Sequence, residues 1–188
     1  MLRESLSGFA RGLAAAGIHF ERASMKAIRA AHFIIVPGGV CDSAVFAETV
    51  RRITDSGSTV LYESGAAYAD LAAFEIERRL LRDYLGLSVE GPHELWPAKP
   101  GAGSPAYVRY HWPSRVMIRD FSRVIAVTGS TCDLTRIARI GETVVACHRQ
   151  LGNGTFIFLG SPLGPHLGFG DADAQRLLEA FTSPRRAA

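Results

Sequence analysis

Hydrophobic residues near the start of the chain recur at the spacing of an α-helix, three or four residues apart, and Gly17 follows them as a helix stop. The periodic positions are Leu2, Leu6, Phe9, Ala10 and Leu13. We therefore expect an N-terminal helix with these side chains on its buried face. A short strand is predicted after it, over residues 18–22.

Strand and helix patterns then alternate up to residue 85. Residues 33–36 are apolar on both faces, as in a parallel strand covered by helices, and residues 59–62 form a second strand. Asp42 is expected to cap the helix between them, which ends at Ser56-Gly57. A long helix is predicted from about 66 to 85. The expected inward positions are Phe46, Thr49, Val50 and Ile53 in the first of these helices, and Ala69, Ala73, Ile76, Leu80 and Tyr84 in the second.

The pattern changes after residue 88. Prolines and glycines predict a long irregular connection over 88–105, followed by β-like runs at 123–127, 134–140 and 143–149. Asn153-Gly154 indicates a hairpin turn before the last core strand, 155–159. Asp171 is expected to cap a final helix. The inward residues predicted for that helix are Ala174, Leu177, Leu178 and Phe181.

Together these elements predict an α/β fold. We expect a flavodoxin-like, doubly wound and mainly parallel sheet with a β-rich insertion before the last core strand. The chain is interpreted as a single domain over residues 1–188, with the insertion at about 88–141 and a disordered tail at about 183–188.

The amino-acid composition excludes several classes of function for this protein. The 188 residues are 47% hydrophobic with a formal net charge of +3, which excludes a disordered chain. No basic stripe with interleaved aromatic residues is present, so nucleic acid is not expected as a partner. No signal peptide or membrane-spanning run is found, and three cysteines cannot form a closed disulfide framework. A cytoplasmic location with free thiols is the simplest interpretation.

Three strand ends are marked by small residues, which let backbone N–H groups approach a ligand. They are 37–39, 63–67 and 160–164. Ligands of open parallel sheets bind beyond the carboxyl ends of the strands, so a crevice is expected here for a small molecule. Tight strand-to-helix turns alone would also explain the glycines. The predicted ligand-binding residues are Gly38, Gly39, Glu63, Ser64, Gly65, Ser161 and His166.

Residues 33–39, 57–68 and 152–162 resemble the class I glutamine amidotransferase-like superfamily. The nearest branches are the biotin–protein-ligase amino-terminal, trehalose-utilisation and β-galactosidase-trimerisation types. The resemblance covers roughly residues 6–85 and 142–182. It implies the same fold and oxyanion donors at Gly38-Gly39, and it associates the chain with carbohydrate metabolism.

The departures from that family are informative. Its active members carry Gly-x-Cys-x-Gly at the turn where this chain has Leu61-Tyr62-Glu63-Ser64-Gly65. Glu63 therefore replaces the cysteine nucleophile, and a carboxylate cannot attack a glutamine amide in its place. The expected His-x-Glu pair is also missing, because His166 is followed by Gly168. The resemblance thus implies that glutaminase activity is lost.

Glu63 has two interpretations. It could face the crevice as a general base, with His166 assisting and the backbone N–H groups of Gly38 and Gly39 stabilising negative charge; the protein would then be a hydrolase. Alternatively, Glu63 satisfies backbone donors at the start of the helix at Ala66. A strained backbone at Glu63 with His166 in hydrogen-bond reach would favour the first hypothesis. Ser64 is interpreted as a helix cap rather than a nucleophile.

The three cysteines and His148 do not form a candidate catalytic or metal site. Cys41 is one turn away from the nucleophile position, and Cys147 and His148 alternate on a strand and so face opposite sides. Cys132 has no closely spaced partner, so no metal site is expected and no cofactor is predicted. Residues 111–113 and 119–121 could line the crevice or a subunit contact.

The sequence therefore favours a non-catalytic glutamine amidotransferase-like domain that binds a small, sugar-like molecule or oligomerises. The hydrolase using Glu63 is the alternative. Members of the superfamily usually open with a strand, whereas this chain opens with a helix. Either the first strand is absent, which leaves a sheet edge for a partner to cover, or the start of the chain is truncated. We expect a homo-oligomer.

Overall fold

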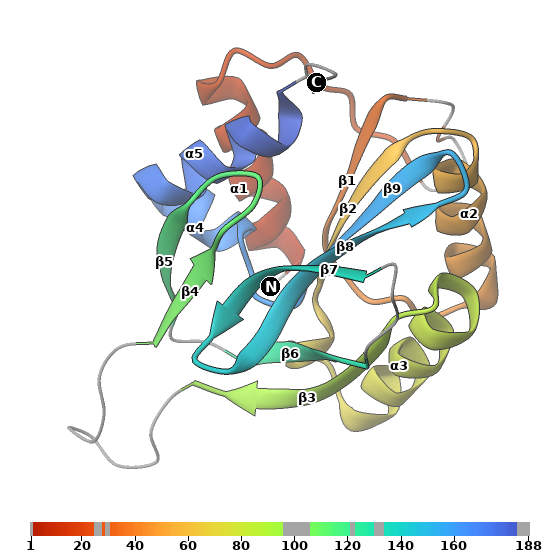
Figure 1. Cartoon of the computed structure of the whole chain (residues 1–188). Coiled ribbons are helices and arrows are strands. Elements are labelled where there is room, and N and C mark those ends of the chain that lie inside the picture. Colours follow the sequence, from red (N-terminus) through yellow and green to blue (C-terminus); the bar gives the residue numbers. More distant parts are fainter. Residues whose placement is uncertain are drawn as a thin grey trace.

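A mixed seven-stranded sheet with helices on both faces organises the chain (Figure 1). The computed structural model describes residues 2–24, 28, 31–95, 106–120, 123–129 and 134–183. The helices are α1 (Leu2–Ala15), α2 (Ala44–Asp55), the 3₁₀ turn η1 (Ala66–Tyr68), α3 (Leu71–Leu85), α4 (Gly164–Phe169) and α5 (Ala172–Thr182). The strands are β1 (Phe33–Gly39), β2 (Thr59–Ser64), β3 (Ser88–Glu94), β4 (Ala106–Tyr110), β5 (Val116–Asp120), β6 (Arg123–Thr128), β7 (Leu134–Ile140), β8 (Thr143–Leu151) and β9 (Gly154–Leu159).

The strand order is β1-β2-β9-β8-β7-β4-β5, and β3 pairs with β6 in a separate two-stranded sheet. Strands β1, β2 and β9 are parallel, whereas β8, β7, β4 and β5 join antiparallel. The α/β fold with a β-rich insertion before the last core strand is thus confirmed. The prediction of a mainly parallel sheet is wrong, because only two of the six strand pairings described in this sheet are parallel. The antiparallel pairs arise in the insertion and just after it, because short hairpins link β4 to β5, β7 to β8 and β8 to β9.

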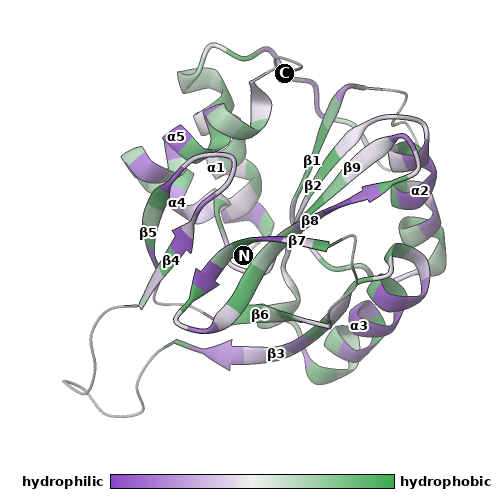
Figure 2. Ribbon diagram, viewed as in Figure 1, coloured by the Kyte–Doolittle hydropathy of each residue, from purple (hydrophilic) through white to green (hydrophobic). Residues whose placement is uncertain are grey.

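Two hydrophobic layers enclose the sheet. One contains α1, α4 and α5, and the other contains α2 and α3. In β2, Leu61 packs toward the first layer, whereas Val60 and Tyr62 pack toward the second. Figure 2 shows hydrophilic and hydrophobic residues alternating around α2 and α3, as expected of helices with one side against a sheet.

Several predicted elements have different bounds. Residues 18–22 form no strand, and the predicted helix over 66–85 is divided into η1 and α3 because Asp70 caps α3 through the N–H of Ala73. Ser43, not Asp42, caps α2. By contrast, Asp171 caps α5, and the inward face of α5 is the predicted one.

The insertion is more regular than its composition suggests. Residues 88–94 form β3, although the sequence predicts an irregular connection there. Strands β4 and β5 and helix α4 are not predicted from the sequence either. The predicted irregular residues 96–105 and most of the predicted tail, 184–188, lie outside the described residues.

Helix α1 buries only part of its predicted face, since Phe9 and Leu13 are buried as predicted. Leu2 and Leu6 are 56% and 38% exposed, whereas Ser5, Gly8 and Gly12 are buried. These small residues face α4, where they let the two helices approach closely. Close packing of small residues therefore orients α1 together with the burial of Phe9 and Leu13.

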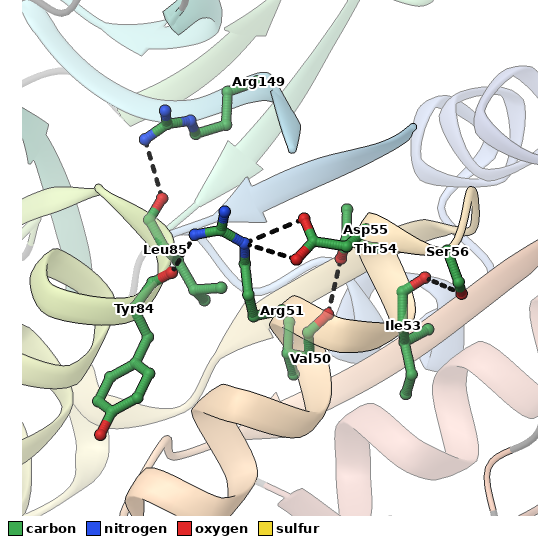
Figure 3. Close-up of polar contacts among 9 residues, drawn as sticks. All are labelled: Val50, Arg51, Ile53, Thr54, Asp55, Ser56, Tyr84, Leu85 and Arg149. Carbon is green, nitrogen blue, oxygen red and sulfur yellow. Dashed lines mark hydrogen bonds and ion pairs between the residues drawn. The ribbon is translucent and has the colours of Figure 1, made fainter. Parts of the chain in front are cut away.

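Polar contacts join α2, α3 and β8 at the C-terminal end of α3 (Figure 3). The Arg51 guanidinium donates to Asp55, at 3.0 Å, and to the carbonyl of Tyr84, at 3.1 Å. Arg149 donates to the carbonyls of Leu85 and Gly86, at 2.9 and 2.7 Å. Arginines thus satisfy carbonyl groups that the helix itself leaves unpaired. None of the described helices is both long and apolar enough to cross a membrane.

Candidate functional site

The carboxyl end of β2 sends alternate side chains to opposite faces of the sheet. Glu63 lies on the α1/α4 face, where its hydrogen-bond partners come from those helices and from β1. Tyr62 and Ser64 lie on the other face and bond to Glu77 of α3. The strand therefore places one buried carboxylate site on each side of the sheet end.

Glu63 is fully buried and accepts four hydrogen bonds. Its Oε1 receives the Ser5 hydroxyl at 3.2 Å and the backbone N–H groups of Leu163 and Gly164 at 2.9 and 3.1 Å. Its Oε2 receives the N–H of Gly38 at 3.1 Å. The first turn of α4 has no side-chain cap of its own, so Glu63 supplies the acceptor. The predicted capping role is therefore played at α4, not at Ala66.

Burial has the largest effect on the pKa of the Glu63 carboxyl. Desolvation raises the pKa of its carboxyl from 4.5 to about 7, and the hydrogen bonds from Gly164, Ser5, Leu163 and Gly38 only partly offset that increase. Although such a pKa would suit a general base, the described contacts leave neither oxygen facing solvent.

A second buried carboxylate, Glu77, lies on the opposite face. It accepts bonds from the N–H of Cys41 at 3.0 Å, from the Ser64 hydroxyl at 2.7 Å and from the Tyr62 hydroxyl. Burial raises its pKa and also that of Tyr62. Glu77 thus fixes the segment after β1 to the end of β2.

The glycine turns at the strand ends pack against each other. The N–H of Gly65 donates to the carbonyl of Gly39 at 2.6 Å, and a Cβ on Gly65 would lie 2.2 Å from the carbonyl oxygen of Gly38. The close approach of these turns requires glycine at position 65. Because the N–H of Gly38 already binds Glu63, it is not free to act as an oxyanion donor.

Helix α1 occupies the space where a ligand crevice is expected. A Cβ on Gly38 would lie 3.0 Å from the side chain of Ser5 and 3.4 Å from the Cα of Leu2. The N-terminal turn of α1 therefore covers the end of β1. A groove of about 300 Å³ lies elsewhere, on the outer side of α3, and is lined by Glu75, Ile76, Arg78, Arg79 and Arg82.

Neither of the predicted site residues after β9, Ser161 and His166, is among the described hydrogen-bond partners of Glu63. The buried Ser161 hydroxyl donates to Asp120 at 2.6 Å, which places Asp120 inside the fold rather than at a subunit contact. The half-buried His166 is not among the four donors to Glu63. Tyr110 lies close enough to Asp120 and Glu63 for their charges to raise its pKa further, after burial.

The hydrolase hypothesis gains no support from this geometry. It requires a strained backbone at Glu63 with His166 in hydrogen-bond reach. Among the described residues, only glycines have positive φ, so Glu63 is unstrained. Ser64 accepts the N–H of Ala66 at 3.2 Å, in keeping with its interpretation as a cap.

The cysteines do not supply a substitute nucleophile. Burial raises the pKa of Cys41 and of Cys147 to about 12, so both remain protonated thiols at neutral pH. Cys147 packs in the α2/α3 layer, whereas the ring of His148 lies tilted against Trp112 with ring centroids 4.4 Å apart. The two side chains therefore face opposite sides, as expected. Cys132 lies outside the described residues. In the part of the chain that the structure describes, no three His, Cys, Asp or Glu residues gather to hold a metal.

The titration of Glu63 predicts how stability depends on pH. Between pH 4.5 and about 7 the folded protein holds a proton that the unfolded chain has released. The free energy of unfolding is therefore expected to fall by about 3 kcal/mol as the pH rises through this range. Urea titrations from pH 4.5 to 8 would measure this change. The same titration of Glu63→Gln should be flatter, and an equal slope in both proteins would contradict the assignment.

The fold belongs to a class that includes domains of glycoside hydrolases and ThuA-like proteins. No family model and no curated protein matches the sequence. Among solved structures, a GH42 β-galactosidase from G. stearothermophilus is similar over 95% of this chain and 26% of its own, with 14% identity and a TM-score of 0.69.

Two other structures show the same likeness. A ThuA-like protein from Bacteroides uniformis is similar over 95% of this chain and 81% of its own, at 12% identity and a TM-score of 0.59. The exo-β-1,4-mannosidase of Opitutaceae bacterium strain TAV5 is similar over 96% of this chain and 30% of its own, at 10% identity and a TM-score of 0.65. The chain thus spans less than a third of either glycosidase. At these identities the likeness shows the fold alone.

Proposed function

We propose that this chain is a non-catalytic module with the glutamine amidotransferase-like fold, and that it functions by assembling with other copies of itself. The main support for this proposal is that the site around Glu63 is closed to solvent. The carboxylate that replaces the family's nucleophile accepts four internal bonds, and α1 covers the adjacent strand end. Because the strand ends are occupied by internal contacts, we expect the protein to function through its outer surface.

Activity and mass measurements test the two parts of this proposal. We expect no release of ammonia from glutamine and no hydrolysis of nitrophenyl esters or glycosides. A turnover that disappears in Glu63→Gln would overturn the non-catalytic part. Light scattering at micromolar concentrations should give a mass at least twice 20.3 kDa, and a monomer would overturn the assembly part.

A sugar-like ligand is the second candidate, because the fold is shared with a β-galactosidase and a mannosidase. A thermal-shift screen with galactose, mannose and trehalose would test it on the wild type and on Glu63→Gln. A sugar that stabilises both proteins equally would show that it binds away from Glu63. If no sugar changes the melting temperature, this candidate is wrong.

A further inference from the structure

Strands β7, β4 and β5 lie side by side at one end of the seven-stranded sheet (Figure 1). One face of these strands packs on the hydrophobic layer of α1, α4 and α5, through Val108, Ile118 and Ile137. Side chains alternate along a strand, so Tyr107 and Met117 lie on the other face, where they are 38% and 49% exposed. The other exposed residues on this face are four arginines: Arg109, Arg119, Arg136 and Arg139.

This exposed face is basic. Asp120 is the only acidic residue in β4, β5 and β7, and it lies on the buried face, where the Ser161 hydroxyl donates to it at 2.6 Å. Glu142, in the turn after β7, is 4.0 Å from Arg139 and fully exposed, so this ion pair contributes little. The three strands therefore present a net positive charge to solvent.

The register of β4 and β5 places each arginine beside an apolar side chain. Tyr107 is opposite Arg119, and Met117 is opposite Arg109. Directly opposite residues have Cβ atoms about 5 Å apart, and diagonal ones about 7–8 Å apart. The ring of Tyr107 is therefore interleaved with positive charges. That arrangement is the one by which proteins bind the backbone and the bases of a single strand together.

The pairing of β4 with β7 brings like charges together. Arg109 is directly opposite Arg139, an arrangement that lowers the stability of a sheet. Arg136 and Arg139 are also on one face, because their partners in β8, Cys147 and Val144, both pack in the α2/α3 layer. An irregular register between the two arginines makes this possible. Such departures from a stable arrangement are expected where function requires them.

We infer that single-stranded nucleic acid binds across the exposed face of β7, β4 and β5. The arginines contact successive phosphates, and Tyr107 stacks on a base. Charges spread over an open sheet face suit an extended polyanion, because small ligands bind in concave sites. An acidic peptide or a sulfated polysaccharide has no planar ring in every unit for Tyr107 to contact, whereas every nucleotide has one.

This inference reverses an expectation drawn from the sequence, in which nucleic acid is not a partner. The arginines belong to three strands that are separated along the chain and adjoin only in the folded sheet. No basic stripe is therefore visible in the sequence itself. The face does not include Glu63, so the inference is independent of the proposed assembly function.

Fluorescence anisotropy with a labelled strand of about 12 deoxythymidines is the direct test. Four phosphate contacts predict that the logarithm of the association constant falls with the logarithm of the salt concentration at a slope of about −3. Arg109→Ala combined with Arg139→Ala should raise the Kd about tenfold or more and halve this slope. Tyr107→Ala should raise the Kd about tenfold without changing the slope, whereas Tyr107→Phe keeps the ring and should bind like the wild type.

Arg52→Ala combined with Arg79→Ala is the matched control, because it removes the same charge from exposed positions of α2 and α3. Equal weakening by the two double variants would overturn the assignment to this face. The Arg109/Arg139 double variant should melt no lower than the wild type, since it removes a pair of like charges, so lost binding would not reflect lost folding. Absence of binding, or polyglutamate that competes as well as the strand, would overturn nucleic acid as the partner.

Discussion

Replacing Glu63 with alanine is expected to lower the free energy of unfolding by about 3 kcal/mol at pH 8. The variant leaves three backbone N–H groups and the Ser5 hydroxyl without their buried acceptor. Four hydrogen bonds to a charged group contribute about 6 kcal/mol together. The rise of the pKa of Glu63 to about 7 already includes these bonds, and it makes the ionised carboxylate about 3 kcal/mol less favourable at pH 8. The remaining loss of about 3 kcal/mol reflects the four buried donors that the variant leaves unpaired.

Two milder variants separate the bonds from the charge. Glu63→Gln keeps the shape but turns an amide N–H₂ group toward either Gly38 or the three donors at Oε1, so a loss of about 2 kcal/mol is expected. Ser5→Ala removes a single bond and should cost about 1 kcal/mol. Urea unfolding monitored by circular dichroism would measure all three variants. If Glu63→Ala is as stable as the wild type, the four bonds do not hold this end of the fold together.

The position of Glu63 could be predicted from the sequence, but its partners could not. The strand pattern at 59–62 followed by small residues places Glu63 at a strand end, as observed. Ser5 and Gly164 are separated from it by 58 and 101 positions. Contacts over such distances depend on how the layers pack, and one sequence carries no local pattern for them. A capping role could therefore be predicted, but not the helix that is capped.

The burial of Glu77 is not predicted from the sequence, because the inward face predicted for α3 differs from the observed one. The predicted face contains Ile76, which is 36% exposed, whereas Glu77 is fully buried. Phe74, Leu81 and Leu85 lie on the observed face and are themselves at helical spacing. This apolar spacing is a sequence pattern that places Glu77 on the side of α3 facing the sheet. Asp120 had no comparable signal, because β5 is a short strand of an unpredicted hairpin.

The most severe steric effect is expected from Gly8→Ala at the crossing of α1 and α4. A Cβ at position 8 would lie 1.7 Å from the carbonyl oxygen of Gly164 and 2.6 Å from its carbon. Both are backbone atoms, so the clash is relieved only when the helices separate. Separation would draw Ser5 away from Glu63 and expose Phe9 and Leu13. We expect a loss of more than about 3 kcal/mol, at the upper end of overpacking effects.

Gly168→Ala on the facing helix is the matched control. Its Cβ would meet the Cα of Gly8 at 3.7 Å, which is ordinary van der Waals contact. Because alanine also favours the helix over glycine, this variant should be neutral or more stable by up to about 1 kcal/mol. Thermal unfolding of both variants, with limited proteolysis near Arg11, would compare them. Equal stability of the two variants would show that α1 does not need its close approach to α4, and the cover over the strand ends would then be an easily displaced segment rather than a fixed part of the fold.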